Sequence, residues 1–244
     1  MSGEPTIVLV HGAFADASSW NGVISRLQAE GLPVTAPANP LRGIAIDSGY
    51  IASVFEQIDG PIVAVGHSYG GAVITNAAID AKNVAALVYV AAFAPDEAET
   101  LGAASADSKD SVLNSALVTR HYPTATGGTA TEFSIDPPKT REAFASDLSE
   151  EQAALIAATQ RPLSELAFSE ASGPPAWKHL PSWAVVATGD KAAGADVTRS
   201  MAERAGAKIT EVEGSHVIMI SQPDAVTAVI LQAVEAVTRV PVRT

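Results

Sequence analysis

The chain has 244 residues, of which 47% are hydrophobic and 17% are charged, a balance too apolar for a disordered protein. Its length predicts one large α/β domain with room for an inserted lid. The 27 acidic residues outnumber the 15 Lys and Arg, giving a net charge of −12, which disfavours nucleic acid and anionic membrane surfaces as partners. The sequence contains no cysteine, which excludes disulfides, thiolate metal sites and a cysteine nucleophile.

Targeting signals are not apparent in the sequence. Residues 1–5 lack a basic region followed by an apolar run, so we expect no signal peptide. The longest apolar run, residues 84–94, is too short to span a bilayer. We therefore expect a soluble cytoplasmic protein, a monomer or homodimer, whose partner is a small molecule.

Continuous apolar runs predict strands that are buried on both faces, as in a parallel sheet covered by helices. Strong runs occur at residues 6–10, 61–65, 84–90 and 183–187, and weaker ones at 33–36 and 208–212. Helical patterns lie between or after them, at 20–27, 44–59, 72–80 and 226–237. This alternation predicts an α/β fold with a mostly parallel, doubly wound sheet.

Residues 95–175 interrupt this rhythm and are richer in Ser, Thr, Asp, Glu and Pro. They contain one clear helix, Ser149 to Gln160, which begins with a Ser-x-x-Gln capping box. We expect 1–94 and 176–244 to form the core domain and 95–175 an inserted, largely helical lid, with 124–131 as loop. An irregular surface excursion is the alternative.

The most informative motif is Gly66-His-Ser-Tyr-Gly-Gly71, directly after the predicted strand 61–65. A G-x-S-x-G sequence at a strand-to-helix turn is typical of a nucleophile elbow, in which a strained serine projects from the sheet. Glycines two positions before and after Ser68 avoid collisions with the neighbouring backbone. A plain glycine-rich turn is the alternative; a phosphate loop would end in Lys-Ser/Thr, which is missing here.

A serine nucleophile needs a base, and the base needs an orienting acid. The chain has histidines at 11, 67, 121, 179 and 216. His216 follows the last predicted strand, at the carboxyl edge where Ser68 must lie, and is our candidate base. We expect His67 to point away from the nucleophile and act as structural support. His121 and His179 are expected to be solvated or capping residues.

Asp190 is the candidate acid because it comes just past the strand 183–187. The chain order Ser68, Asp190, His216 is that of the α/β-hydrolase fold. A second carboxylate, Asp196, is expected to cap the helix that follows it.

The oxyanion hole requires two backbone N–H groups near Ser68. Tyr69 supplies one, at the start of a helix. The loop after the first strand supplies the other, from Ala13 or, as the alternative, Phe14. Phe14 is also expected either to form a wall of the acyl pocket or to pack as an ordinary loop residue.

Together these motifs resemble small bacterial α/β-hydrolase esterases related to the plant methylesterase and hydroxynitrile lyase group. The resemblance is carried by Val8 to Phe14, Trp20, Gly66 to Gly71, Val88 to Ala92 and Gly214 to His216. It implies a serine hydrolase that cleaves carboxylic esters through an acyl-enzyme, without metal or organic cofactor. Residues 191–195 lack the prolines usual after the acid in this family, so the nearby pocket wall is expected to differ.

Three alternative functions use the same scaffold. Perhydrolases and haloperoxidases share the triad. Related hydroxynitrile lyases have a threonine where this chain has Gly12 and a lysine where it has Val217, which argues against cyanide elimination. A ligand-binding protein on the hydrolase scaffold would show little turnover.

Overall fold

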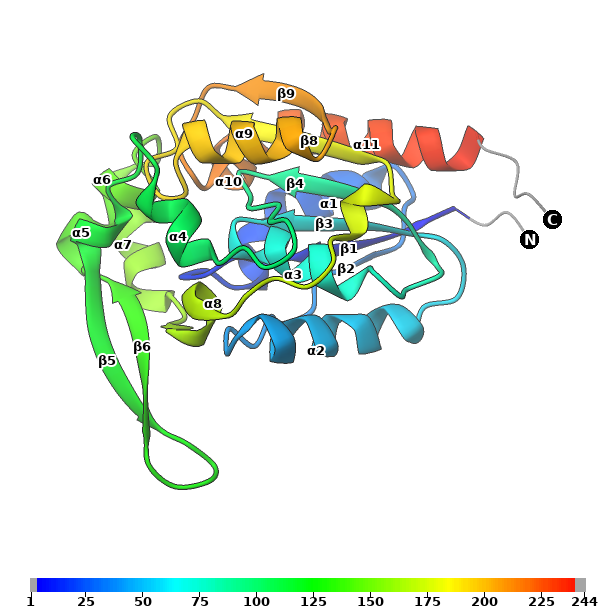
Figure 1. Ribbon diagram of the computed structural model, residues 1–244. Helices are drawn as coiled ribbons and strands as arrows, with labels where there is room; N and C mark the ends of the chain where they lie inside the picture. The colour runs from blue at the N-terminus through cyan, green and yellow to red at the C-terminus, as the bar shows by residue number, and fades with distance from the viewer. Residues whose placement is uncertain (1–3, 240–244) are drawn as a thin grey trace.

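The computed structural model describes residues 4–239, which form a parallel sheet with helices on both faces and an inserted segment above one edge (Figure 1). The strands are β1 (Thr6–Val10), β2 (Val34–Thr35), β3 (Ile62–His67), β4 (Val84–Val90), β8 (Ser182–Ala187) and β9 (Lys208–Val212). Their order is β2-β1-β3-β4-β8-β9, and every neighbouring pair is parallel. The doubly wound α/β sheet predicted from the apolar runs is confirmed.

The central strands have apolar side chains on both faces because helices cover both. In β3, every residue is buried. Two helices, α1 (Asn21–Ala29) and α11 (Pro223–Arg239), contact each other on one face. On the other face α2 (Ile44–Glu56) contacts α3 (Tyr69–Ala77), and Figure 1 shows α9 (Ala195–Arg204) on this side as well. A short helix, α10 (Ile218–Ser221), precedes α11.

Residues 95–175, which we call the cap, lie between β4 and β8. The cap helices are α4 (Leu101–Ala106), α5 (Leu113–Ala116), α6 (Thr140–Phe144), α7 (Glu150–Thr159) and α8 (Leu166–Ser169). The cap also contains an antiparallel sheet of β5 (Leu117–Pro123), β6 (Thr129–Ile135) and β7 (Leu163–Ser164). Its β5–β6 hairpin projects away from the body of the molecule (Figure 1).

The main difference from the sequence prediction is this hairpin. Residues 124–131 are not all loop, because β6 already begins at Thr129, and the turn is made by Gly127 and Gly128 at positive φ. Much of the hairpin is exposed, so its side chains lack the alternation that marks a half-buried strand. By contrast, the capping box at Ser149 is present as predicted at the start of α7.

Candidate active site

Ser68 lies at the turn between β3 and α3, with φ 53° and ψ −123°. A serine at positive φ is uncommon and is maintained by surrounding structure. The flanking glycines permit that turn: a Cβ on Gly66 would lie 2.5 Å from the carbonyl oxygen of Gly70, and one on Gly70 would lie 2.4 Å from that of Val10. The strand, turn and helix therefore pack too closely for any side chain at these two positions.

His216 and Asp190 are joined by a hydrogen bond of 2.8 Å between Nδ1 and Oδ2, and both side chains are buried. Asp190 follows β8, and its other carboxylate oxygen accepts hydrogen bonds from the backbone N–H groups of Ala192 (2.8 Å) and Ala193 (3.1 Å). The Asp190 carboxylate is an acceptor for all three, so Nδ1 of His216 carries the proton. Nε2 is then left free to accept one.

Ser68 and His216 line the same small pocket. Among residues 4–239 no hydrogen bond joins Ser68 Oγ to the His216 ring. Contacts of this kind are often long before substrate binds and tighten in the complex.

The rings of His67 and Phe144 both pack against the His216 ring. The ring centroid of His67 is 4.7 Å from that of His216, and the centroid of Phe144 is 5.0 Å away. His67 Nε2–H donates to the backbone oxygen of His216 over 3.0 Å. Burial holds the pKa of His67 well below its ordinary value, so this ring is neutral. His67 therefore has the structural role predicted for it, and the residue that it supports is His216.

The backbone N–H groups predicted to form the oxyanion hole differ in whether they already donate a hydrogen bond within the protein. The N–H of Phe14 donates to the carbonyl of Arg161 over 3.2 Å. Within the described chain, the N–H groups of Ala13 and Tyr69 have no such acceptor, and both residues line the pocket beside Ser68. The geometry thus favours Ala13 over Phe14 as the second donor.

The side chain of Tyr69 is anchored by a buried carboxyl. Its hydroxyl donates to Asp47 Oδ2 over 2.8 Å, and Asp47 also accepts the backbone N–H of Arg42 at 3.0 Å. Burial raises the pKa of Asp47. The sequence analysis missed Asp47, because an aspartate within an amphipathic helix pattern is typical of a solvated position.

The pocket around Ser68 is apolar and nearly closed. Besides Ser68 and His216, its lining consists of Ala13, Phe14, Tyr69, Phe93, Leu101, Ser105, Leu113, Phe144, Leu163, Phe168 and Ala193. Its free volume is about 20 Å³, roughly the space that one water molecule needs. A substrate can enter only if the cap or the lining side chains move. Phe14 does form part of the wall.

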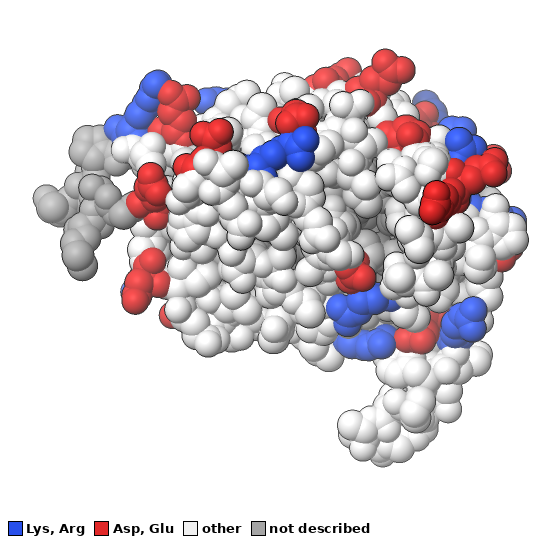
Figure 2. Space-filling model, turned by 180° about the vertical axis from the view of Figure 1, so that it is seen from behind, with Lys and Arg blue, Asp and Glu red and all other residues white. Residues whose placement is uncertain are grey.

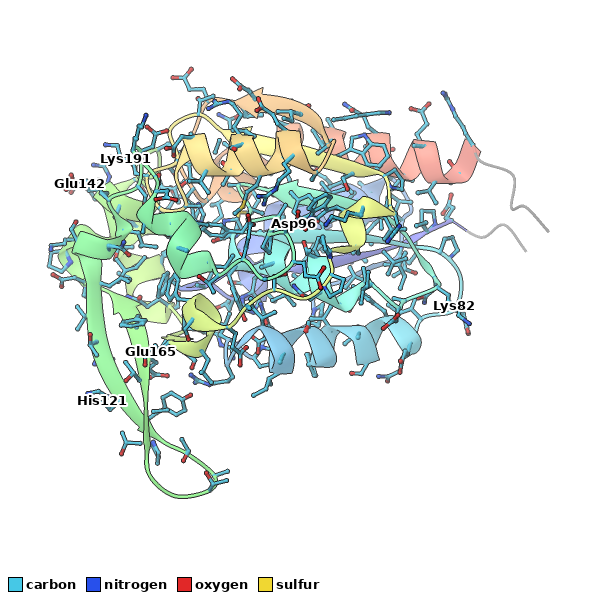
Figure 3. All side chains as sticks on the ribbon, viewed as in Figure 1. Lys82, Asp96, His121, Glu142, Glu165 and Lys191 are labelled. Carbon is cyan, nitrogen blue, oxygen red and sulfur yellow. The ribbon has the colours of Figure 1, made fainter. Side chains whose placement is uncertain are left out.

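The remaining candidates lie outside this pocket. His121 is exposed on the hairpin, far from the sheet (Figure 3), and His179 is exposed before β8. Asp196 does not cap α9 as predicted, because the helix begins one residue earlier, at Ala195. Instead its carboxylate accepts hydrogen bonds from Ser108 Oγ and Lys109 N, both at 2.7 Å, and so fastens a cap loop to the core.

Two kinds of feature are absent from residues 4–239. No helix in this range is long and apolar enough to cross a membrane. No group of three or more His, Asp or Glu side chains there is arranged to hold a metal ion.

Comparison with protein families identifies the class to which this fold and pocket belong. A model described as the alpha/beta hydrolase family matches residues 7–229. The chain therefore belongs to the alpha/beta hydrolase family. A comparison with curated protein sequences gives no match.

Solved structures of plant and bacterial enzymes share the fold. Polyneuridine aldehyde esterase superposes with a TM-score of 0.79 at 22% identity, over 94% of this chain and 99% of that one. A methylesterase from Arabidopsis superposes with a TM-score of 0.78 at 19% identity, over 95% of this chain and 99% of that one. A pyrethroid hydrolase from Sphingobium faniae superposes with a TM-score of 0.73 at 19% identity, over 95% of this chain and 98% of that one. The predicted α/β-hydrolase class is confirmed by the family match, and the likeness to these structures, at 19–22% identity, shows a common fold.

Proposed function

We propose that the protein is a serine hydrolase that cleaves carboxylic esters through an acyl-enzyme. The observation that carries this proposal is the buried hydrogen bond between His216 and Asp190, in a pocket shared with the strained Ser68. The names of its structural relatives, an esterase, a methylesterase and a pyrethroid hydrolase, support the same chemistry.

In the first half of the reaction Ser68 Oγ attacks the ester carbonyl, and its proton passes to His216 Nε2. The Asp190 carboxylate stabilises the imidazolium that forms, and the N–H groups of Ala13 and Tyr69 donate to the oxyanion. Collapse of the tetrahedral intermediate breaks the bond to the alcohol, which leaves with the proton from His216. Water then repeats these steps on the acyl-enzyme and releases the acid.

The pocket lining indicates the kind of ester. Its walls carry four phenylalanines and three leucines, and Ser105 is the single polar side chain in it apart from Ser68, Tyr69 and His216. Such a surface offers no counter-ion to a charged acyl group, and burying an unpaired charge is costly. We therefore expect a neutral ester with a compact apolar acyl group.

The test combines turnover with covalent labelling. Purified protein should hydrolyse p-nitrophenyl acetate and butyrate and react with a serine-directed phosphonate at Ser68. Ser68→Ala should remove the label and lower kcat by about four to six orders of magnitude with the fold intact. If Ser68→Ala retains more than a few per cent of the activity, with contaminating esterase excluded, Ser68 is not the nucleophile.

The same experiment separates the alternatives. Persistent labelling with at most one slow turnover would indicate a ligand-binding protein. Cyanide release from a cyanohydrin would indicate a lyase, although a Cβ on Gly12 would lie 2.6 Å from Ser68 Cβ, which leaves no room for the threonine of the related lyases. Hydrolysis that is slow relative to peroxide-dependent acyl transfer would indicate a perhydrolase.

A further inference from the structure

The loop that carries His216 is fastened at three successive residues by three different parts of the chain. Gly214 O accepts the N–H of Gly189, in the turn after β8, at 2.9 Å. His216 O accepts from His67, at the end of β3, at 3.0 Å. Between them, Ser215 is held by Asp147, which belongs to the cap. Two of these contacts thus come from the core domain and one from the cap.

The contact between Asp147 and Ser215 uses both carboxylate oxygens. Oδ2 accepts the backbone N–H of Ser215 at 2.9 Å, and Oδ1 accepts its hydroxyl proton. Asp147 also packs against the preceding residue, since a Cβ on Gly214 would lie 2.8 Å from Oδ2. Two bonds to one residue define its orientation as well as its position, and bonds to a carboxylate are stronger than neutral ones.

Asp147 is ionised at neutral pH. Partial burial opposes ionisation, but the Ser215 hydroxyl, together with the nearby Ser221 hydroxyl and the backbone N–H groups of Ser215 and Asp147, outweighs it and holds the pKa of Asp147 below its ordinary value. The contact is therefore present in its charge-assisted form under the conditions of an ordinary esterase assay.

The same cap segment reaches His216 itself. Phe144, which ends α6, lies three residues before Asp147 and packs its ring against the imidazole with centroids 5.0 Å apart. The turn between them is closed by a hydrogen bond from Leu148 N to Ala145 O at 3.1 Å. The Phe144 ring and the Asp147 carboxylate thus belong to one short segment. A shift of the cap would therefore move both contacts to the loop that carries His216.

We infer that Asp147 is a positioning residue: by holding Ser215 it determines the position of the neighbouring His216. The position of the His216 imidazole is thereby coupled to the position of the cap. This inference rests on the proposed role of His216. Asp147 contacts no atom that reacts in the proposed mechanism; its effect passes through the loop backbone. Small displacements of a catalytic group lower the reaction rate strongly, since a shift of about 1 Å reduces it by up to about 100-fold.

The experiment compares kcat and KM of the full chain for p-nitrophenyl butyrate in four single variants and one double variant. Asp147→Ala should lower kcat about 10- to 100-fold and leave KM within about twofold. Asp147→Asn should stay within about threefold of wild type, because its amide oxygen still accepts the Ser215 N–H. The control is Asp107→Ala, which removes an exposed cap carboxylate that makes no side-chain hydrogen bond within residues 4–239, and it should leave kcat unchanged.

The fourth variant, Ser215→Ala, removes one of the two bonds. It should lower kcat by a smaller factor than Asp147→Ala, and the double variant should be no slower than Asp147→Ala alone, because the two residues act through one contact. If Asp147→Ala does not fold, wild-type kcat in Ser215→Ala overturns the inference and a reduced kcat with unchanged KM supports it.

Other outcomes are equally decisive. A folded Asp147→Ala with wild-type kcat would overturn the inference, as would an equal loss in Asp107→Ala. The proposed function fails separately, through an active Ser68→Ala, so the two failures are distinguishable.

Discussion

At the scale of single residues, the site depends on hydrogen bonds that determine which ring nitrogen of a histidine carries the proton. Asp190 accepts the Nδ1 proton of His216 at 2.8 Å, which leaves Nε2 free to accept a proton, as the proposed mechanism requires. His11 shows the same principle in a supporting role. Its Nε2 accepts the backbone N–H of Asn39 at 3.0 Å, and its Nδ1–H donates to Gly12 O at 2.9 Å. A buried neutral His11 thereby shapes the loop that carries Ala13.

Asp190→Asn should lower kcat by about four orders of magnitude with little change in melting temperature. The new amide would donate to Nδ1, the imidazole proton would move to Nε2, and Nε2 could no longer accept the serine proton. Steady-state kinetics on p-nitrophenyl butyrate and thermal unfolding measure the two effects.

The matched control is Asp196→Asn, six residues away. Asparagine keeps one oxygen for Ser108 or Lys109, so kcat should stay near wild type, with at most a small fall in melting temperature. An active Asp190→Asn together with an inactive Asp196→Asn would transfer the acid role to Asp196.

At the scale of elements, the cap is hydrogen-bonded to several loops at the carboxyl edge of the sheet. Ser164 N donates to Leu41 O at 3.0 Å, and Val112 N donates to Lys191 O at 2.8 Å. The Arg161 carbonyl accepts from the loop that carries Ala13. Several pocket side chains also come from the cap, namely Leu101, Ser105, Leu113, Phe144, Leu163 and Phe168. The cap therefore both closes the pocket and shapes its walls.

Leu101→Ala should shift the preference of the enzyme toward longer acyl chains. Leu101 is buried on α4 and lines the pocket, so its truncation adds space for about two to three methylene groups. The ratio of kcat/KM for hexanoate over acetate should rise about 10-fold, since each methylene in an apolar pocket contributes about 1–3 kcal/mol. A panel of p-nitrophenyl esters measures the ratio.

Leu155→Ala makes the same substitution at an exposed position of α7, where Leu155 is 61% accessible. It should change neither the ratio nor the stability by much, whereas Leu101→Ala should also destabilise the fold by about 2–5 kcal/mol. An unchanged ester ratio in a folded Leu101→Ala would reassign this part of the cap to a structural role.

At the scale of the whole molecule, charged side chains are unevenly placed on the face seen from behind. Figure 2 shows acidic and basic side chains mostly toward the rim of the back face, with a broad uncharged area between them. Charges of opposite sign pair across elements, as where Arg42 contacts Glu132 at 2.8 Å. The Arg42 guanidinium also lies 4.5 Å from the ring centroid of Tyr122, near the end of β5. The Arg42 side chain is 36% exposed, so solvent screens this pair and its net contribution to stability is small.

Acid should destabilise the fold through its buried histidines. Burial lowers the pKa of His11 from 6.5 to about 4, so the unfolded chain binds the proton more tightly than the folded one. Stability from this group is complete above about pH 6.5 and is lost as the pH falls toward 4, by up to about 3 kcal/mol. Urea unfolding at pH 7, 5.5 and 4.5 measures the loss, to which His67 adds with the same sign.

His11→Gln isolates the contribution of His11, because glutamine can accept the Asn39 N–H and binds no proton in this range. This variant should lose less stability than wild type between pH 6.5 and 4, by up to about 3 kcal/mol. Parallel pH dependences in the two proteins would show that His11 is not responsible.

The sequence by itself determined the sheet strands, the α/β class, the strand–turn–helix around Ser68 and the chain order of the candidate site residues. These features are local: a buried strand is read from its own apolar run, and an elbow from the glycines beside its serine. Helix ends were less well determined; α2, predicted to reach residue 59, ends at Glu56.

Only the tertiary structure decided which side chains support the site. His67 reaches His216 across 149 positions of sequence, and Asp147 reaches Ser215 across 68. Neither residue carries a local pattern that distinguishes it from other histidines or aspartates. The cap hairpin was missed for a related reason, since its exposed strands bury too little apolar surface to leave a periodic signal. Contacts between distant segments depend on how whole elements pack, and packing is a property of the complete fold.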